Sequence, residues 1–182
     1  MQENVLDTRR VYDGRLFNLD VCDVRLPDGS IVAREVVRHP GATALIALDD
    51  QENILLVRQF RIASGQVMSE IPAGTREGDE PPEICAVREL REETGYRPGK
   101  LHALGGFYVA PGYTTEYIYL FLATELVEDR LTGDSDEFIE VTRVTLDEAL
   151  SMIERGEISD AKTIIGVLRY ARHKAAGNAA AL

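Results

Sequence analysis

At 182 residues the chain is long enough for one domain with a sizeable core. Its formal net charge of −11 is spread along the chain, which argues against nucleic-acid binding because that needs clustered Lys and Arg. No apolar run reaches the roughly 18 residues of a membrane span, and the first residues do not read as a secretory signal. Cys22 and Cys85 lie far apart with no metal or redox spacing. We therefore expect a cytoplasmic protein with no membrane partner.

The chain up to residue 74 predicts β-strands. Segments 15–26 ("RLFNLDVCDVRL") and 31–39 ("IVAREVVRH") predict an antiparallel hairpin, because Asp28-Gly29 between them is a strong turn signal. Segments 41–50 and 53–61 predict a second pair of strands that bends at "DQE". The Pro and Gly of "IPAG" then end the strand pattern.

A helix is expected next, capped by Asp79 or Glu80, with two prolines in its first turn and Gly95 at its end. Strands follow at 101–110 and 115–126.

The last third of the chain predicts a polar exposed loop at 127–138 and a strand at 139–144. Two helices follow, one from Thr145 to Gly156 and one over 160–173. Thr145 and Glu148 form a capping-box pattern at the start of the first.

Strands outnumber helices and do not alternate with them regularly, so the fold class is α+β. The expected organisation is an N-terminal β-segment at 1–40, a main domain at 41–175 and a flexible tail at 176–182.

Three glutamates share one face of the helix expected near residue 90. In "AVRELREETGY", Glu89, Glu92 and Glu93 are spaced i, i+3 and i+4, so their side chains project from the same side. Their mutual repulsion favours a cation between them, and carboxylate oxygens suit Mg²⁺. A solvated helix face has the same spacing and is the alternative interpretation. A lone Cys85 one turn earlier makes a poor zinc site.

The surrounding sequence resembles the Nudix box. "GTREGDEPPEICAVRELREETGY" places a glycine, a glutamate, Arg-Glu-Leu, Glu-Glu and a glycine at the spacings of that motif: Gly74, Glu80, Arg88, Glu89, Leu90, Glu92, Glu93 and Gly95. Tyr96 departs from the aliphatic residue usual at the last position, a position that packs. The chain is thereby identified as a member of the Nudix hydrolase family.

The resemblance implies the Nudix fold, a mixed β-sheet sandwiched between α-helices, preceded here by the N-terminal antiparallel β-segment. It implies hydrolysis of a nucleoside diphosphate derivative with Mg²⁺ or Mn²⁺. Carried onto this chain, the principal metal ligands are Glu89 and Glu93, with Glu92 as a third and the backbone carbonyl of Ala73 as a further ligand. Arg88 would orient these glutamates, and Glu80 would brace the start of the helix.

Segments outside the box resemble the ADP-ribose pyrophosphatase branch. Pro111 within "GGFYVAPGYTTEYIYLFLA" stands at the offset typical of that branch, although a simple turn proline explains it equally. "VRQFRIASGQVMSEIPAG" is similar to the segment before the box in such enzymes. By this match Arg61 contacts the diphosphate and Glu70 the adenosine or ribose side. For Arg61 the alternative is a surface strand charge.

The N-terminal 33 or so residues from "RVYDGRLF" onward resemble the β-domain with which this branch dimerises and completes the site of its partner. Phe17 would then stack on adenine, and Arg34 or Arg38 would reach across. A core position for Phe17 and a solvated strand face for the two arginines remain open alternatives.

The general base is expected in the acidic segment "GDSDEFIE", with Glu137 preferred over Asp134, Asp136 and Glu140. A merely hydrophilic loop is the alternative. No Ser-His-Asp arrangement is recognisable around the three histidines.

The leading hypothesis is a metal-dependent, homodimeric ADP-ribose pyrophosphatase that yields AMP and ribose 5-phosphate. The alternatives are a hydrolase of GDP-mannose, NADH or FAD, and a catalytically inactive binding module of the same fold.

Overall fold

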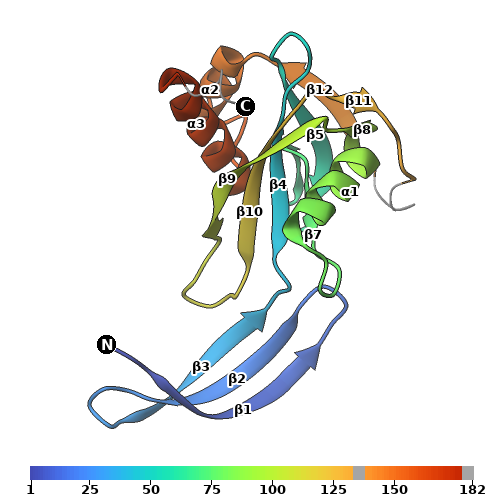
Figure 1. Cartoon of the computed structure of the whole chain (residues 1–182). Coiled ribbons are helices and arrows are strands. Elements are labelled where there is room, and N and C mark those ends of the chain that lie inside the picture. Colours follow the sequence, from blue (N-terminus) through green and yellow to red (C-terminus); the bar gives the residue numbers. More distant parts are fainter. Residues whose placement is uncertain (133–137, 178–182) are drawn as a thin grey trace. The chain divides into compact units, whose positions relative to one another are not determined.

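The computed structural model describes residues 1–132 and 138–177, and these residues form two compact units (Figure 1). The first unit comprises residues 1–41 together with 107–117, and the second comprises the remainder of the described chain. The short segment 107–117 therefore belongs with the N-terminal strands, although about seventy residues separate them in sequence.

The first unit is built on a three-stranded antiparallel sheet of β1 (Asn4–Asp13), β2 (Asn18–Arg25) and β3 (Ile31–Arg38). The predicted hairpin is confirmed. Its turn depends on Gly29, whose φ of 87° is unfavourable for other residues. The sequence does not single out β1, because every residue of this strand is exposed and no buried alternation marks it.

The second unit has a central mixed sheet in the order β7-β4-β10-β9. Its strands are β4 (Ala42–Ala47), β7 (Ala73–Thr75), β9 (Lys100–Tyr108) and β10 (Tyr117–Thr124). Strand β10 runs parallel to β4, whereas β7 runs antiparallel to β4. The contiguous apolar sequence of β4 agrees with its position, since all six of its residues are buried.

A second sheet has the order β12-β5-β6, formed by β5 (Ile54–Arg61), β6 (Gln66–Glu70) and β12 (Glu140–Val144). The prediction that segments 41–50 and 53–61 pair with each other is wrong, because β4 and β5 lie in different sheets and only an isolated bridge, Leu48 to Ile54, joins their ends. β4 and β5 are both apolar and adjacent in sequence, so their pattern predicts a pair. Instead β4 pairs with β10 and β5 with β12, and both of these partners lie far along the chain.

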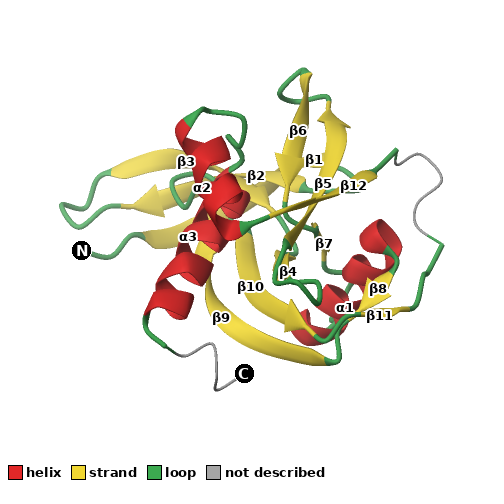
Figure 2. Ribbon diagram, turned by 90° about the horizontal axis from the view of Figure 1, so that it is seen from above, coloured by secondary structure: helices red, strands yellow, loops and turns green. Residues whose placement is uncertain are grey.

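Helix α1 (Pro82–Thr94) lies on one side of these sheets, and α2 (Leu146–Glu154) and α3 (Ala161–Ala175) lie together on the other (Figures 1 and 2). Leu90 of α1 packs into a cluster with Leu45, Leu55 and Phe121 from the strands. Tyr96, the departure from the box pattern, packs against this cluster, and its hydroxyl accepts a hydrogen bond from Arg143 at 3.1 Å. The sequence thus packs the apolar side of α1 against the strands, and of the three glutamates only Glu93 is buried.

The helix boundaries agree with the sequence at most ends. Gly95 ends α1 with a φ of 82°, and Thr145 caps α2 by accepting the backbone N–H of Glu148. The expectation that Asp79 or Glu80 caps α1 is wrong: the N-cap is Pro81, which has no side-chain acceptor. Two short strands lie outside the predicted pattern, namely β8 (Tyr96–Arg97) and β11 (Val127–Glu128), which pair with each other; β11 occupies the start of the predicted loop.

Within residues 1–132 and 138–177, no helix has the length and apolar character needed to cross a membrane. Cys22 and Cys85 are both buried free thiols.

Candidate active site

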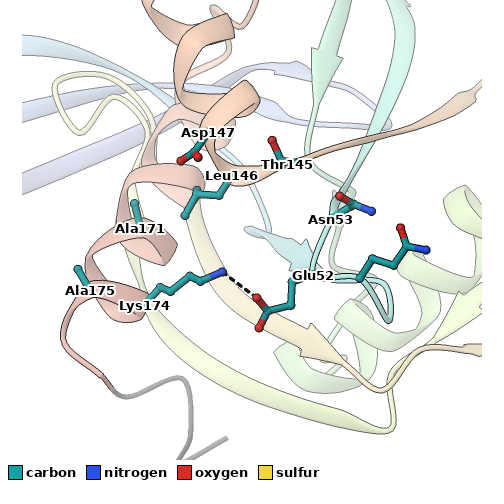
Figure 3. Close-up of a pocket in the computed structure, with 9 residues that line it drawn as sticks. Glu52, Asn53, Thr145, Leu146, Asp147, Ala171, Lys174 and Ala175 are labelled. Carbon is teal, nitrogen blue, oxygen red and sulfur yellow. Dashed lines mark hydrogen bonds and ion pairs between the residues drawn. The ribbon is translucent and has the colours of Figure 1, made fainter.

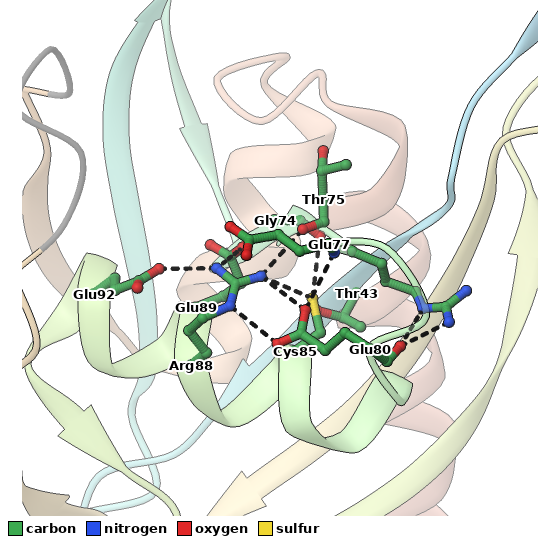
Figure 4. Close-up of polar contacts among 10 residues, drawn as sticks. Thr43, Gly74, Thr75, Glu77, Glu80, Cys85, Arg88, Glu89 and Glu92 are labelled. Atoms are coloured by element: carbon green, nitrogen blue, oxygen red, sulfur yellow. Dashed lines mark hydrogen bonds and ion pairs between the residues drawn. The ribbon is translucent and has the colours of Figure 1, made fainter. Parts of the chain in front are cut away.

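Arg88 stands at the centre of the box helix and contacts three carboxylates at once (Figure 4). Its Nη1 donates to Glu89 at 2.7 Å and to Glu92 at 3.0 Å, while Nε and Nη2 donate to the two oxygens of Glu80 at 3.1 and 3.0 Å. The hydrogen bonds from Arg88 lower the pKa of Glu80, and those to Glu80 raise the pKa of Arg88. The predicted orienting role of Arg88 therefore has a concrete geometry, which fixes Glu89 and Glu92 relative to the N-terminal turn.

The same guanidinium also joins α1 to the preceding strand. Its Nη2 donates to the carbonyl of Thr75 at 3.2 Å and to the Sγ of Cys85 at 3.5 Å. Burial raises the pKa of the Cys85 thiol to about 11. Cys85 is therefore an uncharged, buried thiol at neutral pH.

Gly74 makes room for the carboxylate of Glu89. A Cβ atom placed on Gly74 would lie 1.9 Å from the Cδ atom of Glu89 and 2.1 Å from each of its oxygens. Only glycine, which lacks that atom, allows the carboxylate to lie directly against the backbone of β7. Gly74, the first glycine of the box, is therefore required sterically for the position of the Glu89 carboxylate.

Glu93 is held differently from the other two glutamates. It is 7% exposed, and its Oε2 accepts a hydrogen bond from the backbone N–H of Ala73 at 3.0 Å. This contact places the carboxylate beside the segment whose carbonyl is the predicted backbone ligand. The predicted ligand residues Ala73 and Glu93 are thus brought together.

The three glutamates nevertheless do not form a ready-made chelate. In the part of the chain that the structure describes, no three His, Cys, Asp or Glu side chains converge closely enough to hold a metal ion. Glu89 and Glu92 are turned toward Arg88, and Glu93 toward Ala73. The positive group that lies between Glu89 and Glu92 in this structure is the guanidinium of Arg88.

A buried ion-pair network lies beside this helix, where β5 and β6 meet. Arg61 donates from Nε and Nη2 to the two oxygens of Glu70 at 2.9 and 2.8 Å. Glu70 is 1% exposed, and it also accepts a hydrogen bond from Lys162. Burial alone would raise the pKa of Glu70, but Arg61 and Lys162 outweigh it and lower the pKa. Arg61 and Glu70, both predicted to contact the substrate, therefore form a bidentate ion pair with each other.

Lys162 was not anticipated from the sequence. It lies in the first turn of α3, where its Nζ also contacts Asp160 at 3.0 Å. The hydroxyl of Thr163 accepts the backbone N–H of Ile71 at 2.9 Å, so the same turn holds the segment that leads into β7. A lysine at a helix N-terminus opposes the helix dipole, and this unfavourable placement is the one sequence signal that could have identified it.

The network and the glutamate face are electrostatically coupled. The pKa of Arg61 is raised chiefly by its hydrogen bonds to Glu70, and the negative charges of Glu93 and Asp160 raise it further. Arg61 therefore lies within interaction range of the predicted metal ligand Glu93. A cation beside a carboxylate face is an arrangement suited to binding a metal-complexed anion.

The N-terminal candidates all lie in the first unit. Phe17 packs against Tyr12, with ring centroids 5.7 Å apart, and remains 39% exposed. Arg38 and Arg10 both donate to the carboxylate of Asp20, which is buried.

Two further candidates, Arg34 and Pro111, also lie in the first unit. Arg34 pairs with Glu3 at 3.0 Å. Pro111 is exposed in a turn whose neighbour Tyr113 accepts the N–H of Val37 through its carbonyl at 2.8 Å. The structure thus places Pro111 with the N-terminal strands.

The candidates for the general base are only partly within the described residues. Glu137, Asp134 and Asp136 lie outside them. Glu140 begins β12, where its carboxylate accepts a hydrogen bond from Arg58 of the neighbouring strand at 3.0 Å.

A cavity of about 510 Å³ opens elsewhere in the second unit (Figure 3). It lies between the turn at 51–53, the start of α2 and the end of α3, and Lys174 crosses it to pair with Glu52 at 2.8 Å. None of the predicted site residues that the structure describes lines this cavity.

Comparison with known proteins identifies the family of this chain. The model of the NUDIX domain matches residues 37–165, which include the whole helix α1 and the Arg61–Glu70 pair. The chain belongs to the NUDIX family and is a Nudix hydrolase.

Relatives with assigned activities cover nearly the whole chain. An ADP-ribose pyrophosphatase from Bacillus subtilis is 43% identical over 92% of this chain and 91% of its own. A methanol dehydrogenase activator from Bacillus methanolicus is 42% identical over 91% of each chain. A GDP-mannose pyrophosphatase from Shigella flexneri is 39% identical over 81% of this chain and 83% of its own.

The fold is shown independently by a solved structure. The crystal structure of an ADP compounds hydrolase matches with a TM-score of 0.86 over 97% of each chain, at 21% sequence identity. The predicted α+β Nudix fold is therefore confirmed.

Proposed function

We propose that this Nudix hydrolase cleaves the diphosphate bond of ADP-ribose, giving AMP and ribose 5-phosphate, and that it requires Mg²⁺ or Mn²⁺. The observation that carries the proposal is the position of Arg61, an arginine held by a buried carboxylate within electrostatic range of Glu93. A diphosphate needs a guanidinium donor on one side and a cation-binding carboxylate face on the other. The similarity to the Bacillus subtilis enzyme supports the choice of ADP-ribose.

The donor set fits a hard divalent ion. Glu89, Glu92 and Glu93 supply carboxylate oxygens, the ligand type that Mg²⁺ prefers, and the Ala73 carbonyl adds a fourth oxygen. The cradle of Gly74 behind Glu89 keeps that carboxylate at the protein backbone. Charge neutralisation at the diphosphate and acidification of water are what such an ion supplies when bound. Glu89 and Glu92 would exchange their contacts with Arg88 for contacts with the ion.

The remaining chemistry belongs to side chains. Arg61 binds diphosphate oxygens through the guanidinium edge that Glu70 leaves open, and Glu70 holds Arg61 in place rather than contacting adenosine directly. An acid of residues 134–140, preferably Glu137, accepts the proton of the attacking water. Before the ion binds, Arg88 keeps Glu89 and Glu92 oriented, while its bonds to Glu80 hold the guanidinium itself in place.

The substrate's adenosine side and the oligomeric state form the second part of the proposal. Residues 1–40 mediate a homodimer, in which Phe17 stacks on adenine and Arg38 reaches the substrate, with the turn at Pro111 shaping that side. Support comes from β1, which is exposed along its entire length and carries Leu6, Val11 and Tyr12 as exposed apolar side chains. The proposed location is the cytoplasm, since the two cysteines are free thiols.

Two alternatives have specific support. A GDP-mannose pyrophosphatase at 39% identity makes another nucleoside diphosphate derivative a candidate substrate. The methanol dehydrogenase activator at 42% identity makes a role in which the chain acts on a partner enzyme a second candidate. A binding module without catalysis is disfavoured, because such a module has no need to keep every glutamate of the box.

The deciding experiment measures AMP release from ADP-ribose with and without Mg²⁺, beside GDP-mannose, NADH and FAD at equal concentration. Metal-dependent turnover that is fastest on ADP-ribose supports the proposal. Faster turnover of another compound would keep the proposed role of the three glutamates but would reject ADP-ribose as the preferred substrate. An absence of turnover on all four contradicts the proposed reaction and directs attention to binding.

A further inference from the structure

Lys162 occupies a position that a lysine should avoid. It stands in the first turn of α3, where the helix dipole disfavours positive charge, and its side chain is only 13% exposed. Lys174, near the other end of the same helix, is 40% exposed and lies where a cation is favourable. A buried lysine in an unfavourable position requires compensating contacts, and such departures from local preference concentrate at functional sites.

The compensating contacts connect Lys162 to the proposed diphosphate-binding arginine. Its Nζ donates to Oε2 of Glu70, the same oxygen that accepts from Nη2 of Arg61, and to Oδ2 of Asp160 at 3.0 Å. Asp160 also caps α3 by accepting the N–H of Thr163 at 3.0 Å. The lysine is therefore fixed on one side by the helix cap and on the other by Glu70.

The charge balance around Glu70 shows what this arrangement achieves. The Glu70 side chain is 2% exposed, whereas the Arg61 side chain is 40% exposed, so the pair has one buried and one accessible partner. With Lys162 present, the buried carboxylate has two positive neighbours. Without it, Arg61 would be the one cation among the described residues that contacts Glu70, and the carboxylate that orients Arg61 would be held from one side alone.

We propose that Lys162 is a positioning residue of the hydrolase: by pairing with Glu70, it fixes the carboxylate that holds Nε and Nη2 of Arg61, so that the exposed remainder of the guanidinium is oriented to bind the substrate diphosphate. This inference rests on the diphosphate-binding role of Arg61 in the proposed function. It does not depend on the nucleoside, because ADP-ribose, GDP-mannose, NADH and FAD all contain the diphosphate.

The test is steady-state kinetics on the Mg²⁺-loaded enzyme with whichever of the four compounds the wild type hydrolyses fastest. The variants are Lys162→Met, Lys162→Arg, Arg61→Ala and the double variant Lys162→Met/Arg61→Ala. Lys162→Met should raise KM about tenfold with a much smaller change in kcat, because it disturbs the placement of a binding group. Lys162→Arg keeps the positive charge, so its KM should lie close to the wild-type value.

The double variant distinguishes action through Arg61 from a separate effect. If Lys162 acts through Arg61, the double variant should have the KM of Arg61→Ala within about twofold, because the two changes remove one interaction. Multiplied effects in the double variant would overturn the proposal. So would a wild-type KM in Lys162→Met, whatever the change in Tm.

The matched control is Lys174→Met, which removes an ion pair of the same kind from the other end of α3 and should leave KM unchanged. A similar rise in KM for Lys174→Met would mean that general loosening of the helix is responsible, which also overturns the proposal. A wild-type enzyme that fails on ADP-ribose but hydrolyses another compound rejects only the substrate choice. An unchanged KM in Arg61→Ala rejects the arginine's role and the inference with it.

Discussion

The carboxylate of Glu93 and the backbone N–H of Ala73 are joined by a hydrogen bond of 3.0 Å, which fastens the box helix to the strand before it. This bond uses one oxygen of Glu93 and leaves the carbonyl of Ala73 next to the carboxylate. A single contact therefore sets the distance between two of the proposed metal ligands. The predictions below begin from that contact.

Glu93→Gln should reduce kcat by about 100-fold or more, because it removes the negative charge of a proposed metal ligand. The amide oxygen of glutamine can still accept the N–H of Ala73, so the thermal midpoint should change little. Glu83→Gln, which removes an exposed carboxylate from the same helix, is the control and should keep wild-type turnover. Near-normal turnover in Glu93→Gln would reject its role as a ligand.

Gly74→Ala should displace the carboxylate of Glu89, since the added methyl group would lie 1.9 Å from its Cδ atom. The clash falls on the end of a flexible side chain, so the expected result is weaker activation by Mg²⁺ rather than unfolding. A titration of activity against Mg²⁺ concentration measures this. An unchanged Mg²⁺ requirement would show that Glu89 does not need the space above Gly74.

Glu70 should make stability depend on pH in the acid range. Its folded pKa lies below the ordinary value of 4.5, so its contribution is complete above about pH 4.5 and is lost as pH falls through the folded pKa. At neutral pH, Glu70→Gln should lower the free energy of unfolding by about 2 kcal/mol, a value reduced for the partial exposure of Arg61.

Chemical denaturation of wild type and Glu70→Gln at a series of pH values measures the effect. The difference between the two proteins should narrow below pH 4.5. Glu154→Gln, which removes an exposed carboxylate, is the control and should leave the free energy of unfolding at neutral pH close to the wild-type value. A difference that stays constant down to acid unfolding would contradict the assignment.

Glu137→Gln should slow the chemical step with little change in KM if Glu137 is the general base. The measurement is single-turnover hydrolysis across a range of pH, in parallel with Asp134→Asn, Asp136→Asn and Glu140→Gln. Loss of rate in a neighbouring variant instead would transfer the role to that acid. Among these variants the smallest loss of rate is expected for Glu140→Gln, because Arg58 already holds the Glu140 carboxylate.

Leu6→Glu combined with Val11→Glu should convert a dimer to a monomer, because both side chains lie exposed on β1 and the substitution adds charge to the proposed interface. Sedimentation velocity distinguishes the two states. Leu168→Glu, at an equally exposed apolar position on α3, is the control. A monomeric wild type would reject the dimer outright.

The sequence predicts best those features that one residue type determines locally. Gly95 stops α1 because its backbone adopts a left-handed conformation, and Gly29 makes the turn between β2 and β3 for the same reason. The spacing of the box glutamates likewise follows from helical periodicity alone. These elements were therefore predictable before any tertiary contact was known.

Features that depend on distant partners were not predictable in this way. Strand β4 pairs with β7 and β10 rather than with β5, which no local pattern reveals. Lys162 reaches Glu70 across a long stretch of sequence. Helical spacing by itself places all three glutamates on one face. That Glu89 turns toward Arg88 depends on its close approach to Gly74 and on the bond from Arg88 to the Thr75 carbonyl.

The pairing of β4 with β10 has a consequence for how the chain acquires its structure during synthesis. Residues 42–47 find their parallel partner only in residues 118–123, and β5 finds β12 later still. A nascent chain that ends before β10 would leave uncovered the edge of β4 that β10 occupies, beside the fully buried Leu45 and Ile46. Non-local pairing of this kind slows folding and exposes apolar strands to aggregation. The central strands of this hydrolase are therefore among the first made and the last to be completed.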